Sequence, residues 1–127
     1  MTRKSQEKWQ KILNKLLLGI LCFAFGQVII WYQTNGQFIS KWAKEHPFIM
    51  AATLGVPISY SFIMGTKYIV EHFNGQLWPG RLLGFGIGAI CFGILTYFHV
   101  GEGITSKTAV SLILAVTLVM VQVLWKA

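Results

Sequence analysis

The stretch Leu82–Gly101, LLGFGIGAICFGILTYFHVG, decides the fold of this chain because it contains no Asp, Glu, Lys or Arg. A helix that crosses the hydrocarbon core of a bilayer needs about 20 such residues. Three other charge-free runs are long enough: Leu16–Ser40, apolar only to about Gln33, then Phe48–Thr66 and Thr108–Trp125. The sequence therefore predicts an all-α fold, an integral-membrane bundle of four transmembrane helices, spanning about 16–33, 48–66, 82–100 and 108–125.

The low charge of the chain supports this class of protein. Of its 127 residues 12% are charged, against about 25% in a typical soluble domain. We expect one transmembrane domain over residues 1–127, in which residues 1–15 form a basic amphipathic segment. The basic start and the first apolar run are also typical of a signal peptide, but the run lacks a small-x-small cleavage site, so we expect it to be retained as a span.

The basic residues predict the orientation of the helices. Eight of them fall on the side of the N-terminus: Arg3, Lys4, Lys8, Lys11, Lys15, Lys67, Arg81 and Lys126. The other side has three: Lys41, Lys44 and Lys107. The positive-inside rule then places both termini in the cytoplasm, in the inner or plasma membrane. Aromatic residues are expected at both boundaries, with Trp31 and Trp42 at the outer one and Trp78 at the inner one.

The basic N-terminal segment predicts contact with lipid. Ser5 is a candidate helix cap, and the segment is amphipathic, as in a helix that lies at a membrane surface. We expect anionic headgroups near five residues: Arg3, Lys4, Lys8, Lys11 and Lys15. Alternatively, these residues only set the topology. The net charge of +7 forms no stripe interleaved with exposed aromatics, so nucleic acid is not an expected partner.

The third span carries a repeat of small residues. Gly80, Gly84 and Gly88 recur every four residues, and Gly93 extends the pattern. Glycine lets membrane helices approach closely, so these positions are predicted to pack against a neighbouring helix. The functional alternative is a surface that slides or flexes when the protein changes state.

The second span contains an unusual polar stretch, LGVPISYSF, at Leu54–Phe62. Pro57 removes a helix hydrogen bond, so a kink is expected there. We predict a small polar cavity near the midplane, where transporter sites lie beside broken helices. Its candidate substrate-binding residues are Gln27, Ser59, Tyr60 and Thr96. The alternative is that these polar groups only join helices to each other.

The acidic and catalytic residue types are sparse. No Asp or Glu lies inside a span, and Glu71, at the inner end of the second, is expected to pair with Lys67. No triad, carboxylate pair, metal-ligand spacing or phosphate-binding loop is evident, so we expect no enzyme, no metal and no cofactor. Proton coupling through an intramembrane acid is not predicted.

The last two spans suggest a family. The stretch GIGAICFGILTYFHVGEGITSKTAVSLILAVTLVMVQVLW, Gly86–Trp125, resembles the end of the small multidrug resistance family and of the wider drug/metabolite transporter superfamily. The stretches WYQTNGQF and LWPGR also look like those of uncharacterised four-span proteins. The family resemblance implies a four-helix fold that dimerises through its last helix. The exporters' first-helix glutamate corresponds here to Phe23 or Cys22, which makes proton-driven export of cations doubtful.

The resemblance and the polar cavity together indicate a function. We expect a small transporter, or a transporter or flippase subunit, for a small or lipid-linked solute, working as a homo- or hetero-dimer. The alternative is a membrane scaffold that modulates a partner through its glycine-rich third helix.

Overall fold

The chain is almost entirely helical. The structure, a computed structural model, describes residues 2–125, without the side chain of Ile12. Its elements are α1 (Arg3–Asn35), the short 3-10 helix η1 (Gly36–Phe38), α2 (Lys41–Glu45), α3 (Pro47–His72), α4 (Trp78–Val100) and α5 (Ser106–Leu124). No strand occurs within the described residues. Lys126, which the orientation argument uses, lies outside them.

Four helices are long and apolar enough to cross a membrane: α1 with η1, α3, α4 and α5. The all-α fold and the number of candidate spans are thereby confirmed. All four long helices extend beyond their charge-free runs, because α1 begins at Arg3, α3 continues to His72, α4 begins at Trp78 and α5 begins at Ser106. These extensions include Lys67 and Arg81. A charge limits the length of a hydrocarbon crossing, but it does not end a helix.

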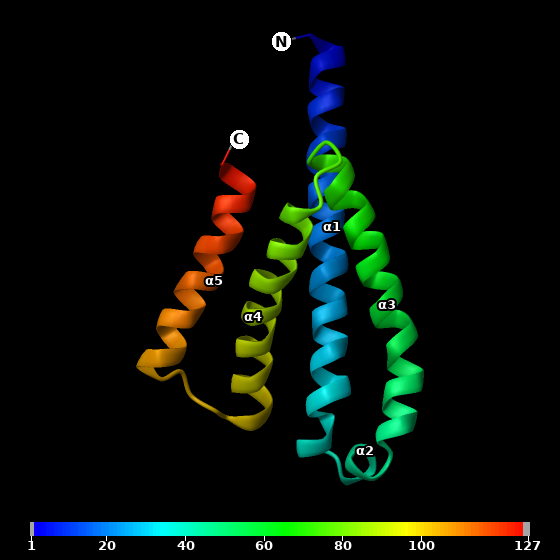
Figure 1. Cartoon of the computed structure of the whole chain (residues 1–127), viewed down its shortest axis with the longest axis vertical. Helices are drawn as coiled ribbons and strands as arrows, with labels where there is room; N and C mark the ends of the chain where they lie inside the picture. The colour runs from blue at the N-terminus through cyan, green and yellow to red at the C-terminus, as the bar shows by residue number, and fades with distance from the viewer. Residues whose placement is uncertain (1, 126–127) are drawn as a thin grey trace.

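The first helix begins earlier than expected, because its N-cap is Thr2 and not Ser5. The Thr2 side-chain oxygen accepts a hydrogen bond from the backbone N–H of Ser5 at 3.2 Å, so the prediction of Ser5 as the cap is wrong. α1 then continues for 33 residues, a length of about 50 Å. The basic segment is therefore the first part of the same long helix, and it projects beyond the other helices (Figure 1).

The acid at the end of α3 has a different partner from the one expected. The Glu71 carboxylate lies 3.3 Å from the Lys15 ammonium of α1, so the predicted pairing with Lys67 is wrong. Both side chains are partly exposed, and such a pair contributes at most about 1 kcal/mol. It nevertheless fixes the basic segment of α1 beside the end of α3.

The helices are arranged around α1, which lies between α3 and α4 (Figure 1). α5 packs against α4 and stands at the edge of the molecule. The described chain ends point toward the same end of the bundle, here called the termini end, and α2 lies across the opposite one, here called the α2 end. Four long helices that alternate in direction bring the two chain ends to one end of the bundle in this way.

The core lies where α1, α3 and α4 meet. Its buried side chains are Phe23, Ile69, Leu83 and Ile87. The α1–α3 contact is reciprocal, because Ile69 packs on Gly19 and Phe23 packs on Gly65. A Cβ at residue 19 would lie 2.5 Å from the Ile69 Cδ1, and one at residue 65 would lie 2.7 Å from the Phe23 Cδ1. Glycine at these two positions lets the backbones approach closely.

The fifth helix is held more loosely than the others. Within the described residues no side chain of α5 is buried. It packs tightly on α4 at Gly86, where a Cβ would overlap Val119 and lie 3.0 Å from the carbonyl oxygen of Ala115. Gly93 faces Leu112, which leaves ordinary van der Waals room for a Cβ at 3.5 Å.

Replacing Gly86 by leucine is expected to separate α5 from α4 while α1, α3 and α4 stay packed, since α5 contributes only partly buried side chains, Val119 and Val123, to their core. Spin labels at the exposed positions Phe98 and Val110, with both native cysteines replaced by alanine, measure this separation by pulsed electron resonance. Gly84→Leu is the matched control, because a Cβ at residue 84 meets nothing within 4 Å. An unchanged distance distribution in Gly86→Leu would contradict the packing described.

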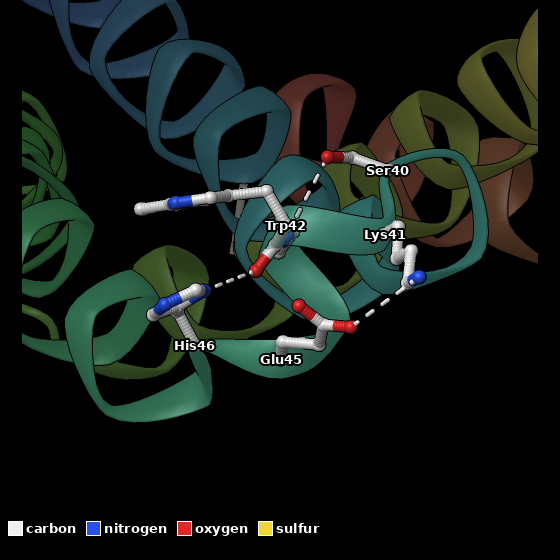
Figure 2. A network of polar contacts seen from close by, with 6 residues as sticks. Ser40, Lys41, Trp42, Glu45 and His46 are labelled. Atoms are coloured by element: carbon white, nitrogen blue, oxygen red, sulfur yellow. Dashed lines mark hydrogen bonds and ion pairs between the residues drawn. The ribbon is translucent and has the colours of Figure 1, made fainter.

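The connection between α1 and α3 forms a capped surface turn (Figure 2). The Ser40 hydroxyl accepts from the backbone N–H of Ala43 at 3.4 Å, and Lys41 lies 3.9 Å from Glu45. The His46 Nδ1 lies 2.8 Å from the Trp42 carbonyl oxygen, and the two rings stack at 4.6 Å. Trp42 is exposed, as an aromatic residue at a membrane interface would be.

Candidate functional site

A groove of about 790 Å³ lies between α1, α3 and α4, and is called here the α1/α3/α4 groove. Most of its lining is apolar or small. The lining residues are Phe23, Gln27, Ile30, Phe62, Thr66, Leu77, Gly80, Arg81, Gly84, Phe85, Gly88 and Ala89. Polar side chains enter it from each of the three helices, an amide from α1, a hydroxyl from α3 and a guanidinium from α4.

The amide in this groove belongs to Gln27, one of the predicted site residues. Its Nε2 donates to the carbonyl oxygen of Gly84 at 3.3 Å. The side chain also lies against Gly88, where a Cβ would come within 2.9 Å of the amide. Gln27 therefore joins α1 to α4 and lines the groove at the same time. It still has hydrogen-bonding capacity, because a glutamine amide has two N–H donors and an accepting oxygen.

Thr96 lies deeper in the bundle and already has a partner. Its hydroxyl accepts from the Trp31 Nε1–H at 2.9 Å, and both residues are buried. Trp31, which was expected at the outer boundary, has 2% of its surface exposed and therefore packs inside the bundle. Beside this bond the Tyr32 hydroxyl lies 2.7 Å from the His99 Nε2, and the His99 ring stacks on Trp31 at 5.1 Å. These four residues join α1 to α4 near the α2 end.

Ser59 and Tyr60 lie elsewhere. Both are exposed on α3, and Tyr60 faces a shallow depression that it shares with Cys22 and Ser61. The four residues predicted to line one cavity are thus divided among three places: Gln27 in the groove, Thr96 in the buried α1–α4 contact, and the α3 pair on an outer surface. Pro57 lies inside an unbroken α3, where its carbonyl oxygen accepts from the Ser61 hydroxyl at 2.8 Å. The kink stays a prediction.

The repeating glycines of α4 face different surroundings. Gly88 packs against Gln27, and a Cβ at Gly80 would lie 3.5 Å from the Ile69 Cγ2. Gly84 has open space on its Cβ side, which faces the groove. At this position, therefore, the small residue makes room in the groove.

Two polar groups of the groove were missed by the sequence reasoning. Thr66 ends the charge-free run of α3, and Arg81 precedes that of α4, so both were assigned to the boundaries. The sequence could have predicted the position of Arg81, because residues 81, 84 and 88 have the spacing of one helix face and so line the same surface of α4. Within residues 2–125 no group of His, Cys, Asp or Glu side chains could hold a metal ion.

Comparisons of this chain with known protein families, with curated proteins and with solved structures find no match.

Proposed function

We propose that this chain is a small integral-membrane transporter, or a transporter or flippase subunit, that binds a small or lipid-linked solute in the α1/α3/α4 groove. The observation that carries the proposal is the groove itself, at about 790 Å³. Small-molecule sites commonly have volumes of about 300–1,000 Å³, apolar walls and a few polar groups. Gln27, Thr66 and Arg81 supply those polar groups here.

The charge of the groove bears on the solute. Among its described lining residues Arg81 is the charged one, and none is acidic. A cationic solute would meet the guanidinium without a carboxylate to balance it. The proposed solute is therefore neutral or anionic, which departs from the cations that small multidrug exporters carry.

The proposal includes an orientation and an assembly. Both termini lie in the cytoplasm, on the basis of the lysine and arginine distribution, and the basic residues of the segment 3–15 contact anionic headgroups. The protein works as a homo- or hetero-dimer in the inner or plasma membrane. Two features support a dimer: four helices enclose little space, and no described side chain of α5 is buried.

Filling the groove is expected to stop transport. Gly84→Leu places a branched side chain in open space, so the fold should persist while the solute site is blocked. Fluorescently labelled phosphatidylcholine and phosphatidylglycerol in reconstituted vesicles serve as probes, with chemical quenching of the outer leaflet as the readout. Wild type is expected to move a probe faster than protein-free vesicles do, and Gly84→Leu should match the protein-free rate.

The matched control is Gly84→Ala, which adds one methyl group and should keep most of the flux. Gln27→Leu should reduce flux while leaving the protein folded, since such an interhelical hydrogen bond contributes only about 0.6–2 kcal/mol. Equal flux in wild type and Gly84→Leu, or no flux above protein-free vesicles, would contradict transport through this groove.

A scaffold is the second candidate. The sequence placed its partner contact on the glycine-rich third helix, but Gly86 and Gly88 of α4 already pack against α5 and α1, so the partner surface is proposed on α5 instead. No described residue of this helix is buried, so a partner protein could cover it. A scaffold needs no open groove. It would therefore tolerate Gly84→Leu and lose its partner when the α5 surface is changed, for example by Leu114→Ser.

A further inference from the structure

The α1/α3/α4 groove ends at a cation that has no counter-charge among the described residues. Arg81, in the first turn of α4, holds its guanidinium carbon 4.9 Å from the centre of the Phe85 ring. The ion pairs within residues 2–125 join other side chains: Arg3 with Glu7, Lys15 with Glu71, and Lys41 with Glu45. A guanidinium presents its N–H donors in a planar fork that matches a phosphate. Arg81 is therefore available to an anion from outside the chain.

The backbone beside Arg81 also favours an anion. α4 begins at Trp78, and Leu77, at its cap position, has no polar side-chain atom to cap it. The first N–H groups of a helix carry partial positive charge and need acceptors. Pro79 has no N–H, and the Arg81 N–H donates to the Leu77 carbonyl oxygen. The groups concerned are therefore the N–H groups of Trp78 and Gly80. Leu77 and Gly80 line the same groove, so this end of α4 adds to the attraction that Arg81 provides.

The rest of the groove is suited to a hydrocarbon chain. From Arg81 it continues past Gly84 to Gly88, a distance of about 10 Å along the helix, beside the apolar side chains of Phe23 and Phe62, whose rings contact each other. Gly84 leaves this path open. A free inorganic anion would occupy only the Arg81 end and would leave the apolar walls uncovered. An amphiphile with a phosphate at one end would use both parts.

We propose that Arg81 binds the phosphate of an anionic lipid whose hydrocarbon chain lies in the groove over Gly84 and Gly88. The inference rests on the proposed function and names the substrate class for the same site. The phosphate lies at the termini end, where the polar connection between α3 and α4 also lies. Gln27 and Thr66 are further along the groove and offer an amide and a hydroxyl to the linker between the phosphate and the hydrocarbon chain.

Native mass spectrometry of the full-length protein in detergent tests the assignment, with phosphatidylglycerol, phosphatidylcholine and inorganic phosphate as separate probes. Wild type is expected to bind phosphatidylglycerol more tightly than phosphatidylcholine. Arg81→Gln should lower the affinity for phosphatidylglycerol about tenfold, which corresponds to about 1.4 kcal/mol, and should lower the affinity for phosphatidylcholine less, because the choline of that lipid already balances its phosphate. Arg81→Lys should be intermediate, because it keeps the charge and loses the fork.

The matched control is Lys67→Gln. Lys67 is an exposed cation of α3 outside the groove lining, so its loss should leave the preference for phosphatidylglycerol intact. Gly84→Leu should weaken the binding of both lipids. The proposal is overturned if Arg81→Gln keeps the preference, if Lys67→Gln removes it equally, if Gly84→Leu retains full binding, or if millimolar inorganic phosphate displaces the lipid.

These outcomes separate the lipid site from the proposed function. If Arg81→Gln keeps its preference while flux of labelled phosphatidylcholine still depends on Gly84, transport stands and the substrate class is wrong. If Gly84→Leu loses lipid but flux is unchanged, the lipid site stands and transport through the groove is wrong.

Discussion

Gly65→Leu is expected to disrupt the contact between α1 and α3 and to lower the stability of the protein strongly. A Cβ at residue 65 would lie 2.7 Å from the Phe23 ring and 3.1 Å from the Cys22 Cβ. Neither neighbour can move away freely, because Phe23 is buried and the Cys22 Cβ is fixed to its helix backbone. The cost should reach the upper end of the roughly 1–3 kcal/mol typical of overpacked cores.

Thermal unfolding in detergent, followed by circular dichroism and size-exclusion chromatography, measures this effect. Gly84→Leu is the control with the same chemical change at a position that faces open space. It should unfold near the wild-type temperature. Similar unfolding temperatures for Gly65→Leu and wild type would mean that α1 and α3 do not pack as described.

Trp31→Ala is expected to destabilise the protein by about 3–5 kcal/mol, the range for removing a large buried aromatic side chain. The indole is almost fully buried, donates to the Thr96 hydroxyl at 2.9 Å and stacks on His99. Its loss would leave a cavity and an unpaired hydroxyl between α1 and α4. Denaturant unfolding in mixed micelles gives the change in free energy.

The hydrogen bond can be separated from the packing by a double-mutant cycle of Trp31→Phe and Thr96→Val. The coupling between the two changes should be about 0.6–2 kcal/mol, as for other interhelical hydrogen bonds in membranes. Tyr97→Phe is a suitable control, because Tyr97 is an exposed aromatic residue that follows Thr96 on α4. A loss for Trp31→Ala no larger than that for Tyr97→Phe would contradict the burial of the indole.

The helical content and the number of candidate spans could be predicted because both follow from the length of the charge-free apolar runs. Charge-free runs such as Leu82–Gly101 report depth directly. The ends of the helices could not be predicted as well, since a helix continues past the hydrocarbon into the interface. Thr2, and not Ser5, is the N-cap of α1. The second long helix of the bundle, α3, continues beyond Thr66 to His72.

The direction in which each side chain points could not be predicted from apolar periodicity. Lipid tails are as apolar as leucine, so the lipid-facing and core-facing sides of a membrane helix have similar composition. Phe23 is buried and Phe25 is exposed, although nothing in the residue type distinguishes them. The same ambiguity placed Tyr60 in a predicted cavity with Gln27, whereas the structure places Arg81 and Thr66 beside Gln27 in the groove.

The glycines at the contact between α1 and α3, Gly19 and Gly65, show another feature that the sequence did not predict. The four-residue spacing of the α4 glycines indicated close packing, but the tightest approaches between α1 and α3 are at Gly19 and Gly65. These two positions lie on different helices, so no spacing within one helix joins them. They lie in the same contact because Ile69 of α3 packs on Gly19 of α1 and Phe23 of α1 packs on Gly65 of α3.

The central claim is that four helices cross the bilayer and bring both ends of the chain to the same side. Single cysteines at Lys4, Lys44, Gln76 and Glu102, with the native cysteines replaced, test it through labelling by a membrane-impermeant maleimide. Positions 44 and 102 should react in intact cells, and positions 4 and 76 only in inverted vesicles. Labelling of all four from one side, or of positions 4 and 44 from the same side, would contradict the account.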